Sequence, residues 1–338
     1  MKVCIYGAGA IGGWMGVKLA QAGCSLDVVA RGATLDALRR DGLSLVSQGE
    51  RVSVPVRASE DPAELGVQDL VVVAVKAPAL PAVAARIAPL LGPDTLVLTA
   101  MNGVPWWFLQ GGFGGPLAGA TLESVDPGSR IGAAIPARQV IGGVVHASCA
   151  LDAPAVVRHN HGNGLIIGEP SGEATARVKA VHALLQRAGI DTTLSPQIQK
   201  DVWYKLWGNM TVNPISMLTG ATTDLIIDDE LVRGFISAIM LEAKEIGARI
   251  GVPIAESPDD RHAVTRKLGR FKSSMLQDVE AGRAVELDAL VSAVRELGQR
   301  TGVATPGTDA LLGLSRLRAR QLGLYNPSVQ GSQVSPAG

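Results

Sequence analysis

The sequence predicts an α/β protein in which an N-terminal Rossmann-type doubly wound sheet is followed by an all-helical domain. Three observations carry this prediction. The chain opens with a short apolar run, a glycine-rich turn and a helix-like segment, which is the order strand, turn, helix. Further apolar runs of strand length follow within the first 100 residues, and almost only helical periodicity appears after residue 196. A chain of 338 residues, 47% of them hydrophobic, is long enough for two such domains.

The strand candidates of the first domain are short and almost continuously apolar, which is typical of a parallel sheet covered on both faces. The segments between them can be helical. From residue 140 the pattern changes to β-rich pieces at hairpin spacing, then a helix, "ATARVKAVHALLQRAGI", and a last strand, "DTTLS". The first four candidates are "MKVCIY" at 1–6, "LDVVA" at 26–30, "LVVVAV" at 70–75 and "TLVLTA" at 95–100.

The second domain should be helical throughout. We therefore expect a Rossmann domain at 1–195 and a helical domain at 196–325. A tail at 326–338 lacks apolar anchors and should be disordered. The expected helices cover 197–219, 228–250, 258–281, 285–301 and 307–322.

Composition narrows the class of partner. Lys plus Arg and Asp plus Glu both number 31, so no overall field would attract nucleic acid or an anionic membrane, and a small ligand is favoured. No apolar stretch is long enough to span a bilayer. Cys4, Cys24 and Cys149 lack metal-type spacing, and their odd number argues against a disulfide framework. We expect a soluble cytoplasmic protein without a metal site.

The glycine turn matches G-x-G-x-x-G through Gly7, Gly9 and Gly12. The first glycine allows the tight turn, the second lets a pyrophosphate approach the backbone, and the third lets the helix pack on the strand. Ala10 and Ile11 lie between the last two glycines, at the helix start whose N–H groups favour negative charge. The motif predicts a dinucleotide site, and a glycine-rich turn without a ligand is the alternative.

The end of the second strand indicates which dinucleotide is bound. An NAD site would place an acid there to accept a hydrogen bond from the ribose 2′-hydroxyl, but the strand ends in Arg31. An arginine can pair with a 2′-phosphate, so NADP(H) is favoured over NAD, with a solvated loop charge as the alternative. Lys76 and Asn102 follow the strands at 70–75 and 95–100, at the carboxyl edge where ligands bind in such sheets.

A polar strip interrupts the otherwise apolar helix at 197–219. On a helical wheel Lys205, Asn209 and Asn213 align with Asp201 and Ser216. An amphipathic surface helix would give the same wheel. Asparagine and glycine are poor helix formers, however, so two asparagines and Gly208 in a helix interior indicate a row of donors along a small polar ligand.

A second group of polar residues lies in "KSSMLQDVEAGRAVELD", residues 272–288. Ser274 followed by Gln277 also reads as a capping box, and Glu286 could be an acid in the first turn of the next helix. A capped helix start with a serine hydroxyl is equally a place to hold a carboxylate. Both interpretations stay open from these residues alone.

Taken in order, the glycine motif, Arg31, Lys76, Asn102, "KLWGNMTVNP" and "SSMLQDVEAGRAVELD" resemble the ketopantoate reductase family, the 2-dehydropantoate 2-reductases. The resemblance extends from Met1 to about Leu324. It implies a C-terminal domain like that of 6-phosphogluconate dehydrogenase, with NADPH and substrate in the cleft between the domains. It also implies hydride transfer to 2-dehydropantoate, giving (R)-pantoate for pantothenate and coenzyme A synthesis.

The resemblance also implies the roles of single residues. Lys205 matches the general acid that protonates the forming alkoxide, and Glu286 matches the acid that orients the substrate hydroxyl. Asp278 would support Ser274 from one helical turn away. The substrate-binding positions matched are Asn209, Asn213, Ser274 and Asn102, and the cofactor-binding positions are Gly7, Gly9, Ala10, Ile11, Gly12, Arg31, Lys76 and Asn102.

Two stretches depart from the family pattern, Trp106 and Trp107 in "MNGVPWWF" and Thr222 and Thr223 after the asparagine-bearing helix. Both should lie near the substrate pocket, which leaves the substrate more open than the reaction. The alternatives are a reductase of another branched 2-keto acid and a non-catalytic NADP(H)-responsive regulator. We also expect a monomer or homodimer, and a mobile glycine-rich flap at 111–119.

Overall fold

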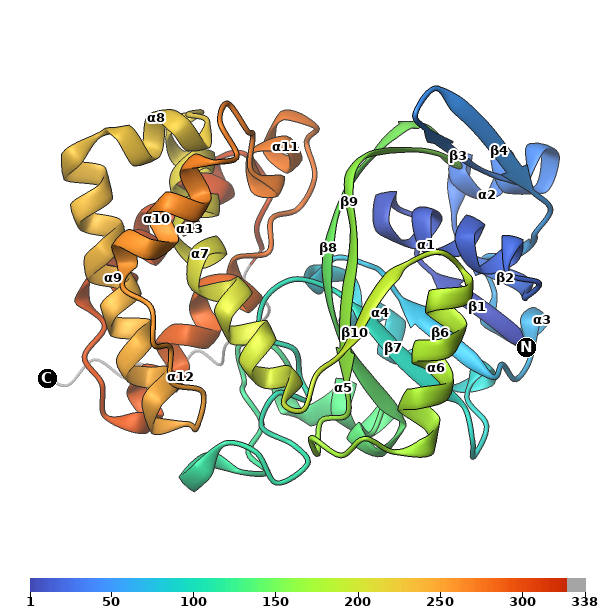
Figure 1. Ribbon diagram of the computed structural model, residues 1–338, viewed down its shortest axis with the longest axis horizontal. Coiled ribbons are helices and arrows are strands. Elements are labelled where there is room, and N and C mark those ends of the chain that lie inside the picture. The colour runs from blue at the N-terminus through green and yellow to red at the C-terminus, as the bar shows by residue number, and fades with distance from the viewer. Residues whose placement is uncertain (327–338) are drawn as a thin grey trace, which may run out of the picture. The chain divides into compact units, whose positions relative to one another are not determined.

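The structure is a computed structural model that describes residues 1–326, and the chain forms two compact units (Figure 1). The sheet unit comprises Met1–Thr121, Arg130–Lys205 and Ile250–Val252. The helical unit comprises Leu122–Ser129, Leu206–Arg249 and the described residues from Pro253 onward. The chain therefore passes between the units at several points. The domain limits predicted from the sequence stay a prediction, and residues 327–338 of the expected tail lie outside the described residues.

The predicted N-terminal sheet is confirmed. Its neighbouring strands follow the order β4-β3-β9-β8-β7-β6-β1-β2-β5, and β10 pairs with β9. Pairing is parallel from β8 across β7, β6, β1 and β2 to β5, as expected for buried apolar strands. The strands are β1 (Lys2–Tyr6), β2 (Ser25–Val29), β3 (Leu43–Ser47), β4 (Glu50–Val54), β5 (Arg57–Ser59), β6 (Leu70–Val73), β7 (Leu96–Ala100), β8 (Val140–Ala153), β9 (Val156–Gly168) and β10 (Asp191–Leu194).

The central strands end at the same level. Tyr6, the last residue of β1, pairs with Val29 of β2 and with Val73 of β6. Val73 in turn pairs with Thr99 of β7. Because these strands are parallel, the loops that follow them leave from one edge of the sheet, which is where open α/β sheets bind their ligands.

Part of the sheet was not predicted. Between β2 and β6 the segments thought able to be helical contain only α2 (Gly32–Asp41) and α3 (Pro62–Leu65), and β3, β4 and β5 occupy much of the rest. The antiparallel strands β3 and β4 are joined at Gln48 and Gly49, whose φ angles are 53° and 86°. Two consecutive positive φ angles are typical of a two-residue hairpin turn. The β-rich pieces after residue 140 form one long hairpin, β8 and β9.

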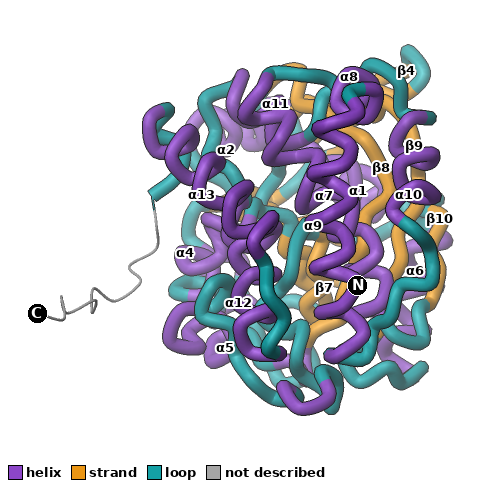
Figure 2. The backbone as a smooth tube through the Cα atoms, turned by 90° about the vertical axis from the view of Figure 1, so that its left-hand side faces the viewer, coloured by secondary structure: helices purple, strands orange, loops and turns teal. Residues whose placement is uncertain are grey.

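Helices of the sheet unit contribute side chains to one hydrophobic core together with the strands. The helix α1 (Ala10–Gln21) contacts β1 and β2 and also β3, β8 and β9, because the sheet curls around it. All residues from Gly12 to Val17 are therefore buried. The helix α6 (Ala176–Arg187) packs along β10 (Figure 2). The remaining helices of this unit are α4 (Leu80–Ala84), α5 (Arg130–Ala134) and the first residues of α7 (Ile198–Thr219).

The helical unit confirms most of the expected helices. The predicted helix at 258–281 is wrong in one respect, since it is two helices separated at Gly269, whose φ is 62°. A short helix, α8, was not predicted. Within residues 1–326 no helix has both the length and the hydropathy needed to cross a bilayer. Besides α7, the helices are α8 (Thr223–Asp228), α9 (Glu230–Arg249), α10 (Pro258–Arg266), α11 (Ser274–Glu280), the π-helical segment η6 (Asp288–Ser292), α12 (Ala293–Thr301) and α13 (Pro306–Gln321).

Candidate functional site

The glycine turn has the geometry of a dinucleotide cradle. Gly7 follows β1 with φ at 100°, its N–H donates to Val29 O at 3.2 Å, and Gly9 is the N-cap residue of α1. A Cβ atom added at Gly12 would lie 2.1 Å from Gly7 O, whereas one added at Gly9 would meet no atom within 4 Å. Gly12 is therefore required by the fold. Gly9 is not, which leaves open space above the helix start for a phosphate group.

This contrast gives a pair of matched substitutions. Gly12→Ala should destabilise the fold, by about 1–3 kcal/mol as in other overpacked sites, since the clashing atom belongs to the backbone and cannot rotate away. Gly9→Ala should keep the wild-type melting temperature but weaken NADPH binding at least about tenfold, because its methyl group would occupy the phosphate space. Thermal unfolding and NADPH titration of both variants measure this. Undiminished NADPH affinity in Gly9→Ala would contradict the cradle.

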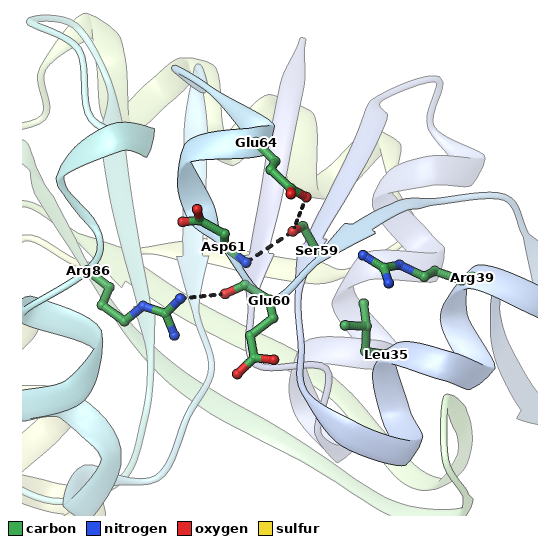
Figure 3. A pocket seen from close by; sticks show the side chains of 7 residues that line it. All are labelled: Leu35, Arg39, Ser59, Glu60, Asp61, Glu64 and Arg86. Atoms are coloured by element: carbon green, nitrogen blue, oxygen red, sulfur yellow. Dashed lines mark hydrogen bonds between the residues drawn. The ribbon is translucent and has the colours of Figure 1, made fainter.

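Arg31 precedes α2, the helix whose residues Leu35 and Arg39 line a pocket. It is exposed, and the neighbouring Ala30 N–H donates to Ser59 O at the end of β5. The pocket has a volume of about 420 Å³ and is open to solvent, and Figure 3 shows Glu60 between the side chains of Arg86 and Arg39. Its lining comes from α2, from the segment that runs from β5 into α3, and from the turn after α4: Leu35, Arg39, Ser59, Glu60, Asp61, Glu64 and Arg86.

Hydrogen bonds fix the shape of this pocket. Ser59 Oγ donates to Glu64 Oε2 at 2.5 Å and accepts from Asp61 N at 3.0 Å. Arg86 Nη2 donates to Glu60 O at 3.1 Å. Burial raises the pKa of the Tyr6 hydroxyl at the end of β1, and the positive charges of Arg86 and Arg31 oppose that rise. Both guanidinium groups therefore act electrostatically on the hydroxyl of Tyr6, the residue before the glycine turn. Arg86 was not predicted, because only the folded chain brings its side chain to Glu60, 26 residues away in the sequence.

Lys76 and Asn102 lie where the sequence placed them. Lys76 follows β6, in extended conformation, and begins the 3₁₀ turn Ala77–Ala79. Asn102 follows β7, and both residues are half-buried. Because β6 and β7 end level with β1, the two side chains belong to the same edge of the sheet as the glycine turn. The predicted cofactor-binding residues of the sheet unit thus all follow strands that end at the same level.

Lys205 of α7 is held by the sheet unit. Its half-buried side chain donates from Nζ to Val145 O of β8 at 2.6 Å. The register of β8 against β9 shifts between His146 and Ser148, just beyond this carbonyl. Irregularities of this kind are frequent next to active sites, because they re-aim backbone groups. The Lys205 ammonium is thus fixed to a backbone carbonyl rather than directed into bulk water, and α7 is not a solvated amphipathic helix at this position.

Asn213 joins the two polar groups found in the sequence. Its side chain is 6% exposed, and its Nδ2 donates to Ser274 Oγ at 3.4 Å. Asn209 lies one helical turn earlier on α7 and is half-buried. The other two members of the predicted strip have local partners. Asp201 accepts from the Ser195 hydroxyl, and Ser216 Oγ donates to Ala221 O.

The capping-box interpretation of Ser274 is wrong by one residue. Ser273 is the residue that caps α11, and its Oγ accepts from Leu276 N at 3.1 Å. Gln277 donates instead to Lys272 O. The hydroxyl of Ser274 is therefore not used for capping, which is why it can contact Asn213.

Glu286 lies in a buried stretch that leads into η6. Its side chain is 6% exposed, between Val285 and Leu287, which are also buried. Asp278, which we expected to support Ser274, is 2% exposed and accepts from Arg283 Nε at 3.0 Å. The Asp278–Arg283 ion pair closes the turn between α11 and the Glu286 segment. A buried carboxylate at this position needs polar partners, so Glu286 is unlike a solvated first-turn acid.

The structure explains why a glycine occurs at position 208 of α7, which the sequence alone did not. A Cβ atom there would lie 2.7 Å from both Nε and Nη2 of Arg261, a residue of α10. The absence of a side chain at position 208 thus lets a guanidinium pack against α7 immediately beside Asn209. Arg261 was not among the predicted site residues, because only the packing of α10 against α7 brings it there.

The tryptophans and threonines that depart from the family pattern have structural roles. Trp106 and Trp107 are 4% and 1% exposed, and Trp106 Nε1 donates to Ile135 O at 3.0 Å, so both belong to the core rather than to a pocket lining. Thr222 is the N-cap residue of α8, and its hydroxyl donates to Asp224. Thr223 is buried and donates to Gly269 O at 2.7 Å. Neither departure therefore needs a different substrate to explain it.

Comparison with known proteins gives matches to both units. The family model Ketopantoate reductase PanE/ApbA matches residues 3–106, and Ketopantoate reductase PanE/ApbA C terminal matches residues 197–319. A 2-dehydropantoate 2-reductase of Mesorhizobium japonicum is 46% identical over 327 residues, 96% of this chain and 100% of the relative. A crystal structure of a candidate ketopantoate reductase from Ralstonia solanacearum MolK2 is 56% identical, with a TM-score of 0.92 over 96% of this chain and 99% of the other. The crystal structure of 2-dehydropantoate 2-reductase from Geobacter metallireducens GS-15 is 26% identical, with a TM-score of 0.82 over 94% of this chain and 99% of the other.

Proposed function

Because the chain belongs to the ketopantoate reductase family, we propose that it reduces 2-dehydropantoate to (R)-pantoate. A nicotinamide dinucleotide supplies the hydride when bound, and the ketone oxygen takes a proton to become the hydroxyl of the product. The protein must then hold the ketone, stabilise the negative charge that develops on its oxygen, and deliver the proton. An enzyme of this pathway would act in the cytoplasm.

Lys205 is the proposed proton donor. An ammonium is a hydrogen-bond donor to the ketone and becomes a proton source as the alkoxide forms. It carries three N–H bonds, so the bond to Val145 O is compatible with donation to a substrate oxygen. That bond supports the assignment, since it restricts a long, flexible side chain to one place and reduces the entropy lost when substrate binds.

The other proposed substrate-binding residues differ in whether they accept or donate hydrogen bonds. Glu286 is proposed to accept a hydrogen bond from the terminal hydroxyl of 2-dehydropantoate, and Asn209, Asn213 and Asn102 to donate to its oxygens. Ser274 can donate or accept. The hydrogen bond between Asn213 and Ser274 is the observation that carries this set, because it connects two stretches that lie 61 residues apart in the chain.

The substrate is an anion, and its carboxylate needs a positive partner. The asparagines and serine are neutral, Glu286 is an acid, and Lys205 serves the ketone. Arg261 packs against Gly208, next to Asn209, and we assign its guanidinium to the carboxylate. A planar guanidinium can bind a carboxylate through two parallel hydrogen bonds.

Gly208→Ala tests this role without touching the arginine. A methyl group at position 208 must displace the guanidinium, which is the end of a flexible side chain and can move at little cost. Alanine also favours the helix over glycine, by about 1 kcal/mol. We therefore expect an unchanged or higher melting temperature together with a KM for 2-dehydropantoate raised about tenfold. Gly234→Ala on α9, where a Cβ meets no atom within 4 Å, is the matched control. Equal KM values in both variants would remove Arg261 from carboxylate binding.

Arg31 and the pocket beside it are proposed to hold the adenosine end of the cofactor, with a preference for NADPH. The exposed guanidinium of Arg31 and the nearby one of Arg86 would favour a 2′-phosphate over a 2′-hydroxyl. Lys76 would then contact the cofactor further along the same edge of the sheet. Gly7, Gly9, Ala10, Ile11 and Gly12 would hold the pyrophosphate.

Steady-state kinetics with a panel of 2-keto acids tests the function as a whole. The value of kcat/KM should be highest for 2-dehydropantoate and lower for branched 2-keto acids that lack its hydroxyl group, because only the former can use Glu286. NADPH consumption in the absence of any keto acid is the blank. No preference for 2-dehydropantoate over its neighbours would overturn the proposed substrate and leave a reductase of another keto acid.

A further inference from the structure

The last described residues of the chain return to the segment that carries Glu286. After α13 the chain turns at Gly323, whose φ is 69°, and Leu324 N–H donates to Ala319 O at 2.9 Å. Leu324 O then accepts from Val285 N at 3.1 Å. The side chain of Tyr325 is 8% exposed, and the Arg320 guanidinium lies 6.0 Å from the centre of its ring. This segment is therefore packed into the helical unit rather than extended into solvent.

The Tyr325 hydroxyl binds the start of η6. Tyr325 Oη donates to Asp288 Oδ1 at 2.7 Å, and Ser292 Oγ donates to the same oxygen at 2.9 Å. Burial raises the pKa of Tyr325, and the Asp288 carboxylate raises it further. The hydroxyl therefore keeps its proton, and the direction of the bond is from tyrosine to aspartate.

These contacts lie on both sides of Glu286. Val285 is bound through its N–H one residue before it, and Asp288 is bound through its carboxylate two residues after it. The helical turn that follows starts with Leu290 N–H donating to Glu286 O at 3.2 Å and continues as the π-helical segment Asp288–Ser292. Such segments are rare and occur frequently at functional sites. The backbone on both sides of Glu286 is thus held by Leu324 and Tyr325.

We propose that Tyr325 is a positioning residue for Glu286, and that through Glu286 it sets the preference for a substrate with a terminal hydroxyl group. The inference rests on the substrate-binding role proposed for Glu286. Tyr325 acts on the orientation of that carboxylate by holding Asp288, and it does not contact the substrate. Loss of the Tyr325 hydroxyl should therefore impair recognition of the hydroxyl group and leave cofactor binding and proton delivery unchanged.

The test compares two substrates in one variant. For Tyr325→Phe, kcat/KM is measured with 2-dehydropantoate and with trimethylpyruvate, the analogue that lacks the hydroxyl group. We expect the ratio of the two values to fall about tenfold relative to wild type, with the value for trimethylpyruvate and the Kd for NADPH unchanged. A merely structural role would lower both values together and leave the ratio as it was, which would overturn the proposal.

Three further variants sharpen the result. Asp288→Asn keeps an acceptor oxygen for both hydroxyl groups and should retain most of the wild-type ratio, whereas Asp288→Ala should lower it as Tyr325→Phe does. Thr301→Val removes a hydroxyl that donates to Leu297 O at 2.7 Å on α12, away from Glu286, and should leave the ratio unchanged. A lowered ratio in Thr301→Val would show a general effect of stability and contradict a specific role for Tyr325.

Combination with Glu286→Gln separates this inference from the role of Glu286 itself. If Tyr325 acts through Glu286, adding Tyr325→Phe to Glu286→Gln should lower the ratio no further. Additive losses in the double variant would overturn the positioning role. If Glu286→Gln alone leaves the ratio at its wild-type value, the proposed contact between Glu286 and the substrate hydroxyl fails, and the inference built on it fails with it. A lowered ratio in Glu286→Gln beside a wild-type ratio in Tyr325→Phe would overturn the inference alone.

Discussion

Replacement of Lys205 by alanine is expected to lower kcat for reduction of 2-dehydropantoate at least ~10²-fold, because general acid catalysis typically contributes that much. The substitution removes the proton donor and the positive charge that stabilises the developing alkoxide. It also leaves Val145 O without the Lys205 hydrogen bond, which should cost about 1 kcal/mol of stability. Single-turnover kinetics, NADPH titration and thermal unfolding separate these effects, and NADPH affinity should stay near the wild-type value.

Two further variants at and near this position isolate the chemistry. Lys205→Arg keeps the positive charge, but a guanidinium with its much higher pKa is a poor proton donor, so kcat should remain low. Lys200→Ala removes an exposed lysine from the same helix and should leave kcat unchanged. Wild-type turnover in Lys205→Ala would remove this residue from the mechanism, whatever the effect on stability.

The second large effect is expected at Arg31. Arg31→Asp should reverse the cofactor preference from NADPH to NADH, because an aspartate repels a 2′-phosphate and accepts a hydrogen bond from a 2′-hydroxyl. A reversal of charge at one phosphate contact should shift the ratio of the two kcat/KM values about 10²-fold or more. The fold should tolerate the change, since Arg31 is exposed and precedes α2 in the position where aspartate is a favoured N-cap.

The control for Arg31→Asp is Arg40→Asp, which makes the same change of charge at an exposed position of α2. Its cofactor preference should remain that of the wild type, apart from a small effect that disappears at higher ionic strength. Equal affinity of the unmodified protein for NADPH and NADH would contradict the role of Arg31. The same outcome would leave the glycine cradle intact, since pyrophosphate is common to both cofactors.

Much of the sheet unit could be predicted because its signals are local. The run "MKVCIY", the glycine turn and the helix that follows form one continuous stretch. Within it, the residue types indicate the local backbone conformation. Gly7 adopts a positive φ and Gly12 excludes a side chain, as the motif predicts. The hairpin at Gln48 and Gly49 was missed although it is equally local, since its strands are short and carry many polar residues.

Predictions in the helical unit were correct for long periodic helices and wrong at their interruptions. Periodicity gave α7, α9 and α13, but the break at Gly269 and the short helix α8 carry too few residues to show a period. The break matters for the site, because it lets Ser273 cap a new helix and leaves Ser274 to meet Asn213.

The sequence by itself determined the central strands of the Rossmann-type sheet, the glycine turn and the polar strip of α7, because each depends on neighbouring residues whose backbone conformation or burial follows from residue type. Only the tertiary structure decided which distant segments meet: Asn213 with Ser274, Arg261 with Gly208, and Tyr325 with Asp288. Those pairings arise from the packing of whole helices against one another. Local periodicity does not show which residue, tens of positions away, a side chain will contact. The contacts of Tyr325 and Leu324 on either side of Glu286 could therefore be found only in the folded chain.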